Sequence, residues 1–328
     1  MAVNFINLLK SKFDDALKAQ ALLFINSEQR SLTSASGQKF QVRYAPSLAT
    51  KPTRPQDQKC RDPFAPPYVR ELFVCDWAID ESLSKDEDES YAVLLNKYCV
   101  VPRHFLLVTK AFQSQMLPPS PMDLFALDAI LKQAHATEPE NDWIAFYNCG
   151  PESGASQPHK HFQFLPVEKS QNPFGDLITS CSPEREDDAF SFPSLSFTHF
   201  AVLLPKSRLS SKSASSDSME MELGRRFMTL LDLMILHLRH MSNKDTSVLR
   251  ELSYNFVMTH SYMLLVPRSQ ENFGSSKISI NSLGVGAGMI LVKDQNQLDE
   301  LMQMGIDQIL AGVTFPILEK CIDPCSNE

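Results

Sequence analysis

The chain has 328 residues, of which 43% are hydrophobic, so it is long enough and apolar enough to bury a sizeable core. Its 31 Lys and Arg residues face 39 Asp and Glu residues, and the resulting formal net charge of −8 argues against a protein that binds nucleic acid through nonspecific phosphate contacts. The seven cysteines are dispersed without a CxxC pair, which excludes a zinc ribbon and a disulfide framework and fits a reducing compartment.

The N-terminal region begins with an amphipathic pattern. Apolar residues alternate with Lys and Asp at helical spacing over residues 3–30, which predicts a helix. No basic segment precedes an apolar block there, and no run of about 18 uncharged apolar residues occurs in the chain. We therefore expect a protein without membrane association, located in the cytoplasm and also, as an alternative, in the nucleus. Five prolines between 52 and 67 then predict a loop.

The middle of the chain alternates strand and helix patterns. Residues 91–110 contain two β-rich runs and predict a hairpin that turns near Asn96-Lys97 or Pro102-Arg103. The next elements follow from apolar spacing and turn residues. They are a helix at 122–136, a strand at 143–150, a loop at 151–158 and a strand at 159–167.

The C-terminal part repeats this order. It contains a strand at 197–204, a low-complexity loop at 211–222, a long helix at 225–241 and paired strands at 253–268. Because the order of helix, strand, connection and strand occurs twice, we expect a structural pseudo-repeat of two halves. Short turns with few βαβ units favour an α+β fold with a mainly antiparallel sheet, and a doubly wound fold is the alternative.

The most informative string lies between Asn148 and Leu165. Side chains alternate along a strand, so His159, His161 and Gln163 share one face and the residues between them occupy the other. The small residues of the preceding loop let a backbone approach a phosphate and offer N–H and hydroxyl donors to it. A neutral imidazole, with its ordinary pKa of about 6.5, is a competent nucleophile toward phosphorus. His161, at the centre of the array, is therefore the candidate nucleophile.

Other interpretations of the same residues are weaker. An HxH pair is often a pair of metal ligands or of solvated side chains. A metal needs a third and a fourth ligand, however, and Gln is a poor ligand for transition metals, so no protein metal site is predicted. The glycine-rich run at 284–288 lacks the GK[ST] of a phosphate-binding loop and predicts a tight turn before a strand.

The string SGASQPHKHFQF at 153–164 resembles the signature of the diadenosine polyphosphate phosphorylases, or ATP adenylyltransferases, a branch of the histidine-triad superfamily in which Gln replaces the third histidine. Further similarity is found at 51–68, 94–110, 254–269 and 280–293. The resemblance implies an α+β fold like that of galactose-1-phosphate uridylyltransferase, built from two pseudo-repeat halves. It divides the chain into an N-terminal helix and Pro-rich substrate loop at 1–70, a catalytic half at 71–195 and a degenerate half at 196–328.

The resemblance also implies a two-step phosphorolysis of diadenosine tetraphosphate to ATP and ADP. His161 would attack the α-phosphorus and expel ATP, and inorganic phosphate would then release the adenylyl group as ADP. Gln163 would bind phosphoryl oxygens without acting as a general acid, and His159 would orient the nucleophilic ring. We expect a monomer with no tightly bound cofactor, no nucleic-acid partner, and Mg²⁺ carried by the phosphates of the substrate.

By the same resemblance, further residues contact the substrate. Lys51 would bind the polyphosphate, and Asn96 and Lys97 the ribose or a phosphate. The run at 284–288 is one residue longer than in the family, which affects the register of the last two contacts named here. The α-phosphate would be lined by Asn148, Ser153, Gly154, Ala155, Ser156 and Gln157, and the second half would contribute Asn281, Ser282, Met289 and Lys293.

Three other functions stay open. One is a nucleoside-diphosphosugar phosphorylase or another uridylyltransferase-like nucleotidyltransferase, which would use the same histidine chemistry. The second is a non-catalytic nucleotide-binding sensor, and the third is a hydrolase that releases AMP because water replaces phosphate. The products formed from diadenosine tetraphosphate and from a nucleoside-diphosphosugar separate these functions.

Overall fold

The computed structural model describes residues 4–50, 61–78, 90–183, 185–192, 194–205, 216–241 and 252–317. The predictions for Lys51, for the Pro-rich segment up to residue 60 and for residues 211–215 lie outside this part of the chain.

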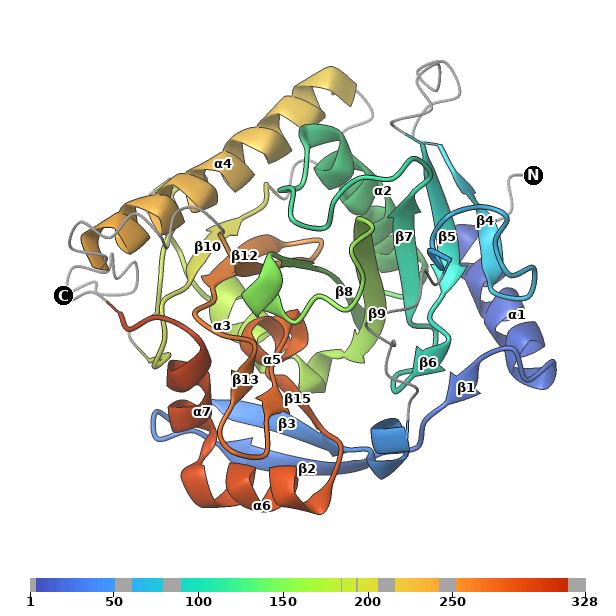
Figure 1. Cartoon of the computed structure of the whole chain (residues 1–328). Coiled ribbons are helices and arrows are strands. Elements are labelled where there is room, and N and C mark those ends of the chain that lie inside the picture. The colour runs from blue at the N-terminus through green and yellow to red at the C-terminus, as the bar shows by residue number, and fades with distance from the viewer. Residues whose placement is uncertain are drawn as a thin grey trace.

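An eight-stranded sheet occupies the centre of the molecule (Figure 1). Its strands follow the order β10-β12-β11-β8-β9-β7-β5-β4, and every neighbouring pair is antiparallel. This arrangement confirms the predicted antiparallel sheet. The strands are β4 (Phe73–Trp77), β5 (Tyr91–Leu95), β7 (Phe105–Thr109), β8 (Asn141–Cys149), β9 (His161–Glu168), β10 (Phe200–Leu203), β11 (Tyr254–Met258) and β12 (Tyr262–Pro267).

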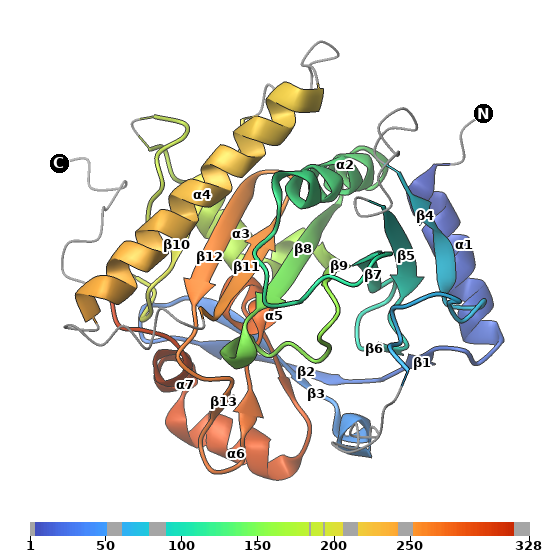
Figure 2. The same ribbon diagram turned by 45° about the horizontal axis from the view of Figure 1, so that its top comes forward.

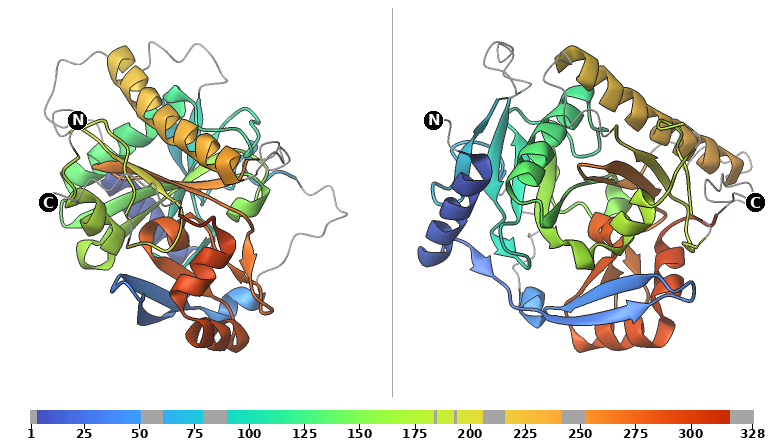
Figure 3. Two further views of the ribbon diagram at one scale, coloured as in Figure 1. Left: turned by 90° about the vertical axis from the view of Figure 1, so that its left-hand side faces the viewer. Right: turned by 180° about the vertical axis from the view of Figure 1, so that it is seen from behind.

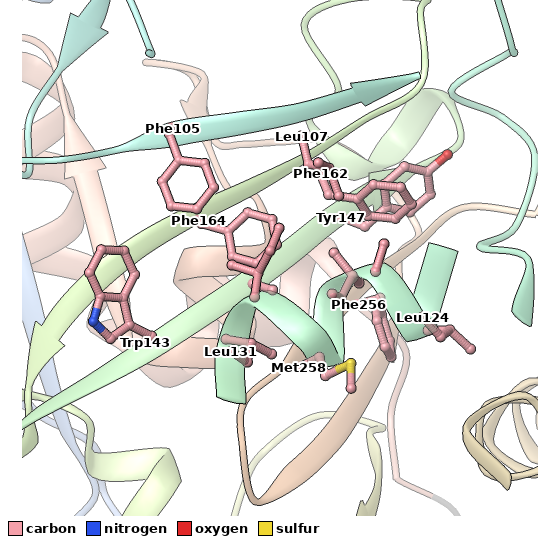
Figure 4. Packing of buried hydrophobic residues seen from close by; sticks show 14 of the residues in the cluster. Phe105, Leu107, Leu124, Leu131, Trp143, Tyr147, Phe162, Phe164, Phe256 and Met258 are labelled. Atoms are coloured by element: carbon pink, nitrogen blue, oxygen red, sulfur yellow. The ribbon is translucent and has the colours of Figure 1, made fainter. Parts of the chain in front are cut away.

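Three helices cover one face of this sheet. α2 (Pro121–Thr137) and α4 (Ser216–Met241) pack against each other, and α1 (Phe5–Lys18) lies near β4 (Figure 2). Between the helices and the sheet lies an apolar core in which Phe162 and Phe164 of β9 are fully buried (Figure 4). α2 begins with a capping box of Ser120 and Asp123. The two phenylalanines thus fix which face of β9 points away from these helices.

The opposite face carries a second layer. β15 (Met289–Val292) pairs in parallel with β3 (Lys39–Tyr44), which pairs antiparallel with β2 (Glu28–Thr33). The strands of this layer lie below the main sheet, together with α6 (Gln295–Met304) and α7 (Ile306–Val313) (Figures 1 and 3). The N-terminal and C-terminal parts of the chain therefore share one small sheet. The remaining elements are α3 (Pro173–Thr179), α5 (Ser282–Ala287), β1 (Leu23–Phe24), β6 (Tyr98–Cys99), β13 (Asn272–Phe273) and β14 (Ile278–Ser279).

The predicted repeat corresponds to two similar sets of elements. α2 leads into the antiparallel pair β8 and β9, and α4 leads into the antiparallel pair β11 and β12. β8 and β11 pair with each other at the centre of the sheet, and α2 packs against α4. The two halves thus form one sheet with one layer of helices above it. Among the described helices, none is long and apolar enough to cross a lipid bilayer.

Several predicted elements are confirmed, and others are wrong in extent. The helix predicted over 3–30 ends at Lys18, because Gln20 adopts the left-handed conformation with φ 55° and the chain then forms strands. The strand predicted from residue 159 begins at His161, while His159 makes only an isolated bridge with Ser114. The confirmed elements are the hairpin at 91–110, the helix at 122–136, the helix at 225–241 and the strand pair at 253–268.

Two predicted loops contain helical residues. Within the low-complexity stretch, residues 216–222 form the first turns of α4, where Glu222 bonds the guanidinium groups of Arg225 and Arg226. The glycine-rich run expected to be a tight turn belongs to α5, which ends at Gly288 in the left-handed conformation. In both places local side-chain and capping interactions stabilise helix where composition suggested loop.

Candidate active site

His161 is the first residue of β9 and lies on the face opposite the two long helices. Its Nδ1 atom is 2.8 Å from the carbonyl oxygen of His159. Because a carbonyl oxygen can only accept, Nδ1 carries the hydrogen and donates it. No hydrogen bond from the described residues engages Nε2, so the lone pair of that nitrogen is left for a ligand.

The imidazole of His161 is 3% exposed. Burial is the largest effect and lowers the pKa of His161 to about 4. The hydrogen bond to the His159 carbonyl and the charge of Asp62 raise this pKa, and the neighbouring His159 lowers it, but these effects are smaller than that of burial. The ring is therefore neutral at pH 7. A neutral ring with a free Nε2 lone pair is the form that can attack phosphorus.

His159 is fully buried, and both its ring nitrogens face acceptors. Nε2 is 2.7 Å from the carbonyl oxygen of Thr109, and Nδ1 is 2.6 Å from Oδ2 of Asp62. Phe64 packs on both histidines, with its ring centroid 4.9 Å from that of His161 and 6.2 Å from that of His159. The described end of the Pro-rich segment thus covers the start of β9.

Gln115 bridges β8 and β9 where their ladder stops. The backbone pairs end at Phe146 and Gln163, two positions before Asn148 and His161 would pair. Instead the Gln115 side chain accepts from the His161 N–H at 2.8 Å and donates to the Asn148 carbonyl oxygen at 2.8 Å. This inserted amide holds the two strands apart at the position where the loop at 150–158 leaves the sheet, and so fixes the width of the site.

A hydrogen-bonded chain orients Gln163. Oε1 of Gln163 lies 3.0 Å from Nε2 of His104, and Nδ1 of His104 lies 3.0 Å from Nδ2 of Asn96. Since an amide oxygen only accepts, His104 donates through Nε2 and accepts from Asn96 through Nδ1. The Nε2 donors of Gln163 are thereby the groups that it offers to a ligand. Asn96 is brought into the site by this chain, whereas Lys97 beside it is exposed.

The second half of the chain reaches the site through Asn148. Oδ1 of Asn148 accepts from Nδ2 of Asn255 at 2.9 Å, from the Ser282 N–H at 3.0 Å and from the Ser282 hydroxyl at 2.7 Å. Buried Arg268 donates in turn to Oδ1 of Asn255. With its oxygen saturated, Asn148 presents its Nδ2 donors to a ligand. Asn148 and Ser282, both named above as expected substrate contacts, are therefore neighbours in the structure.

The loop between β8 and β9 needs glycine at two positions. Gly150 and Gly154 have φ values of 87° and 81°, in the left-handed region that favours glycine. A Cβ atom at Gly154 would lie 3.1 Å from Cβ of Asn281, so this close approach brings the loop against the N-cap of α5. Asn255 also donates to the carbonyl oxygen of Ser153 at 2.8 Å. The predicted phosphate loop, which includes Ala155, Ser156 and Gln157, therefore begins from a fixed backbone.

Two predicted contacts come from β15 and the residue that follows it. Met289 lines a cavity of about 390 Å³ together with Arg43 and the end of β9 at Pro166 and Val167. Lys293 follows β15, and its N–H donates to the side chain of Gln297. Contacts of these two residues with a substrate stay predictions. Among the described residues, no group of three or more His, Cys, Asp or Glu side chains is arranged to hold a metal ion.

Comparison with known proteins identifies this arrangement. Residues 2–179 match the family model of the Ap4A phosphorylase N-terminal domain, and residues 193–316 match that of the ATP adenylyltransferase C-terminal domain. The chain belongs to the Ap4A phosphorylase family. It is 32% identical to diadenosine 5',5'''-P1,P4-tetraphosphate phosphorylase 2 of Saccharomyces cerevisiae, with 95% of each chain covered. The family resemblance expected from the sequence is thereby confirmed.

Solved structures agree with this assignment to the Ap4A phosphorylase family. The crystal structure of yeast Ap4A phosphorylase Apa2 matches with a TM-score of 0.77 at 30% sequence identity and covers 95% of this chain and 98% of that chain. The structure of the same yeast protein in complex with Ap4A matches with a TM-score of 0.75 at 30% identity and covers 96% and 99% of the two chains. The expected α+β fold is confirmed, and the chain is a nucleotidyltransferase.

Several residues of this candidate site carry no recognisable motif in the sequence. Asp62 and Phe64 lie within the Pro-rich segment, and His104 precedes a buried strand, so the sequence offers only an Asp-Pro-Phe string and a single His as signals. Gln115 and Asn255 carry no local pattern at all. Their roles depend on contacts between segments far apart in the chain, which only the folded structure brings together.

Proposed function

We propose that the chain catalyses phosphorolysis of diadenosine tetraphosphate through an adenylyl-His161 intermediate. Nε2 of His161 attacks the α-phosphorus, a bond from nitrogen to phosphorus forms, and the bond from that phosphorus to the bridging oxygen breaks to release ATP. An oxygen of inorganic phosphate then attacks the same phosphorus and displaces the imidazole, which gives ADP. The observation that carries this proposal is the neutral His161 ring with its hydrogen fixed on Nδ1.

The neighbouring groups support this chemistry. The amide nitrogens of Gln163 and Asn148 are the groups that these side chains offer to a ligand, since the oxygens of both amides are already bonded. Such donors stabilise the charge that grows on phosphoryl oxygens in the transition state. An amide has no basic atom that could activate water, so Gln163 favours transfer to phosphate over hydrolysis. All these groups come from one chain, which supports a site that a monomer completes.

The substrate enters, in this proposal, as its Mg²⁺ complex. A tetraphosphate bridge carries several negative charges, and the protein itself has a formal net charge of −8. Magnesium is commonly held by substrate phosphates together with few protein ligands. Loss of turnover in EDTA and its recovery on addition of Mg²⁺ test this point, and full activity in EDTA contradicts it.

A labelling experiment tests the proposed function. Substrate labelled at the α-phosphate is mixed with the protein in the absence of phosphate, and an acid-labile, alkali-stable label on the protein is expected. Phosphate should release this label as ADP. His161→Ala should lose the label and at least about 10³-fold in turnover, since nothing replaces the nucleophile. His240→Ala, which alters an exposed histidine at the end of α4, is the control and should behave as the unmodified protein.

The products also separate the alternatives. AMP in place of ADP, in the presence of phosphate, indicates hydrolysis. Turnover of a nucleoside-diphosphosugar without turnover of diadenosine tetraphosphate indicates the sugar-nucleotide reaction. Binding with thermal stabilisation but without consumption of the ligand indicates a sensor. A label that persists on His161→Ala would show that another residue is the nucleophile.

A further inference from the structure

His159 has an acceptor at each ring nitrogen although its side chain is fully buried. The carbonyl oxygen of Thr109 lies 2.7 Å from Nε2, and a carboxylate oxygen of Asp62 lies 2.6 Å from Nδ1. The hydroxyl of Thr109 also lies 3.1 Å from Nε2. Lys160, the next residue, points to the other face of the sheet and pairs with Asp123 at 2.5 Å. Asp62 is therefore the described carboxylate that pairs with His159.

The carboxylate of Asp62 is itself fixed on both oxygens. Oδ2 accepts from His159, and Oδ1 accepts from the N–H of Phe64 at 2.9 Å, which closes an Asx turn. Phe64 is buried in a cluster with residues of β5 and β7, and Arg61 donates to the carbonyl oxygen of Pro67 at 2.7 Å. The segment that carries Asp62 is thus anchored to β7, which pairs with β9, and to β5, which pairs with β7.

His199 provides an internal comparison. Its Nδ1 also lies 2.8 Å from the carbonyl oxygen two residues earlier, that of Phe197. Its Nε2, however, accepts from the N–H of Phe192 at 2.7 Å, so this ring is held on both sides. His161 must keep Nε2 free for phosphorus, and within the part of the chain that the structure describes its ring makes one hydrogen bond, to the His159 carbonyl. The position of His159 therefore determines the direction in which Nε2 of His161 points.

We propose that Asp62 is a positioning residue: it holds the buried ring of His159 between itself and Thr109, and thereby fixes the carbonyl oxygen that orients the His161 ring. This proposal rests on the proposed role of His161 as the nucleophile. Asp62 does not touch the reacting atoms. It acts through His159 on the orientation of the His161 ring. Displacements near 1 Å at a reacting atom are enough to lower a reaction rate about 10²-fold.

Single-turnover labelling with α-phosphate-labelled diadenosine tetraphosphate tests the proposal. Asp62→Ala should slow formation of the adenylyl-protein about 10- to 100-fold, while the dissociation constant for AMP stays within about twofold. Formate, which can occupy the space of the missing carboxylate, should restore part of the rate in a saturable manner to Asp62→Ala but not to His161→Ala. Asp299→Ala, at an exposed position on α6, is the control and should label at the normal rate.

Asp62→Asn covers the case in which the Ala variant does not fold. The amide keeps a hydrogen-bond partner for His159 without its charge, so labelling should be slower than normal but faster than in a folded Asp62→Ala. Proton NMR gives a readout that needs no turnover. A strongly deshielded Nδ1–H resonance of His159 should be present in the unmodified protein and in His161→Ala, and absent from both Asp62 variants.

The outcomes are distinct. Normal labelling rates in Asp62→Ala and Asp62→Asn, or absence of the deshielded resonance from the unmodified protein, would overturn the role of Asp62 and leave the nucleophile intact. A rate loss accompanied by an equal loss of AMP affinity, without rescue by formate, would show a general structural role and also overturn it. Failure of the unmodified protein to label at all would instead overturn the proposed function.

Discussion

Single hydrogen-bond acceptors decide the chemistry of the side chains around β9. The carbonyl oxygen of His159 places the proton of His161 on Nδ1, and the amide oxygen of Gln163 places a proton of His104 on Nε2. Each of these bonds determines which atom is left to face a ligand. For His161 the group left is Nε2, the proposed nucleophile, and for Gln163 it is an amide donor.

Replacing this donor should change the fate of the intermediate. Gln163→His introduces a nitrogen that can accept a proton from water, so we expect the share of AMP among the products to rise severalfold at the expense of ADP. Chromatography of the products at fixed phosphate concentration measures this ratio. Gln133→His, at an exposed position on α2, is the control. An unchanged ratio in Gln163→His would show that the amide does not protect the intermediate from water.

The sequence was sufficient to place residues that belong to a local periodic pattern. Alternation along a strand correctly put His161 and Gln163 on one face and Phe162 and Phe164 in the core. The roles of the substrate-contact residues stay predictions. Asp62, 97 residues away from His159 along the chain, could not be found in this way, because a partner so distant leaves no periodic signal.

The side chain of Gln115 bridges the gap between β8 and β9. Gln115 is buried, and its amide replaces a backbone pair between Asn148 and His161. Gln115→Met keeps the volume but leaves an N–H and a carbonyl oxygen without partners, so we expect the free energy of unfolding to fall by about 1–3 kcal/mol. Urea unfolding measures this, with Gln133→Met as the control. A loss below that of the control would contradict the bridging role of Gln115.

A buried ion pair anchors the start of β9 from the other face. Lys160 bonds Asp123, which belongs to the capping box of α2 and also accepts from the hydroxyl of Tyr91 at 2.7 Å. Lys160→Met alone leaves the carboxylate buried without its cation and should cost about 3–5 kcal/mol. Adding Asp123→Leu removes that unpaired charge, so the double variant should be more stable than either single variant. Additive losses in urea unfolding would show that the two side chains do not act as a pair.

Helix and strand identity followed from the sequence better than helix and strand length. The N-terminal pattern continued to residue 30, but the helix stops at Lys18 because the next residues join sheets made by distant segments. Leu23 pairs beside Tyr98, and β2 pairs with β3, which itself pairs with β15. Such pairings override the local helix propensity, and the sequence of residues 19–33 does not indicate which strands they will pair with.

Each half of the chain contains a described histidine that burial keeps neutral at pH 7. Burial lowers the pKa of His161 to about 4 and also that of His199 to about 4. In the unfolded chain both rings take up protons near pH 6.5, whereas in the folded protein they do so only near pH 4. The free energy of unfolding therefore has its full value above pH 6.5 and falls as the pH is lowered toward 4. Each ring contributes about 3 kcal/mol to this loss at most.

Unfolding by urea at pH 8, 6.5, 5 and 4 measures the loss. His199→Phe removes one of the two titrating rings and should be less stable at pH 8, since the bonds to Phe192 and Phe197 are gone. Between pH 6.5 and 4, however, its stability should fall by about 3 kcal/mol less than that of the unmodified protein. A parallel fall in both proteins would mean that His199 binds its proton equally in the folded and unfolded states, and that the buried core does not exclude the charge.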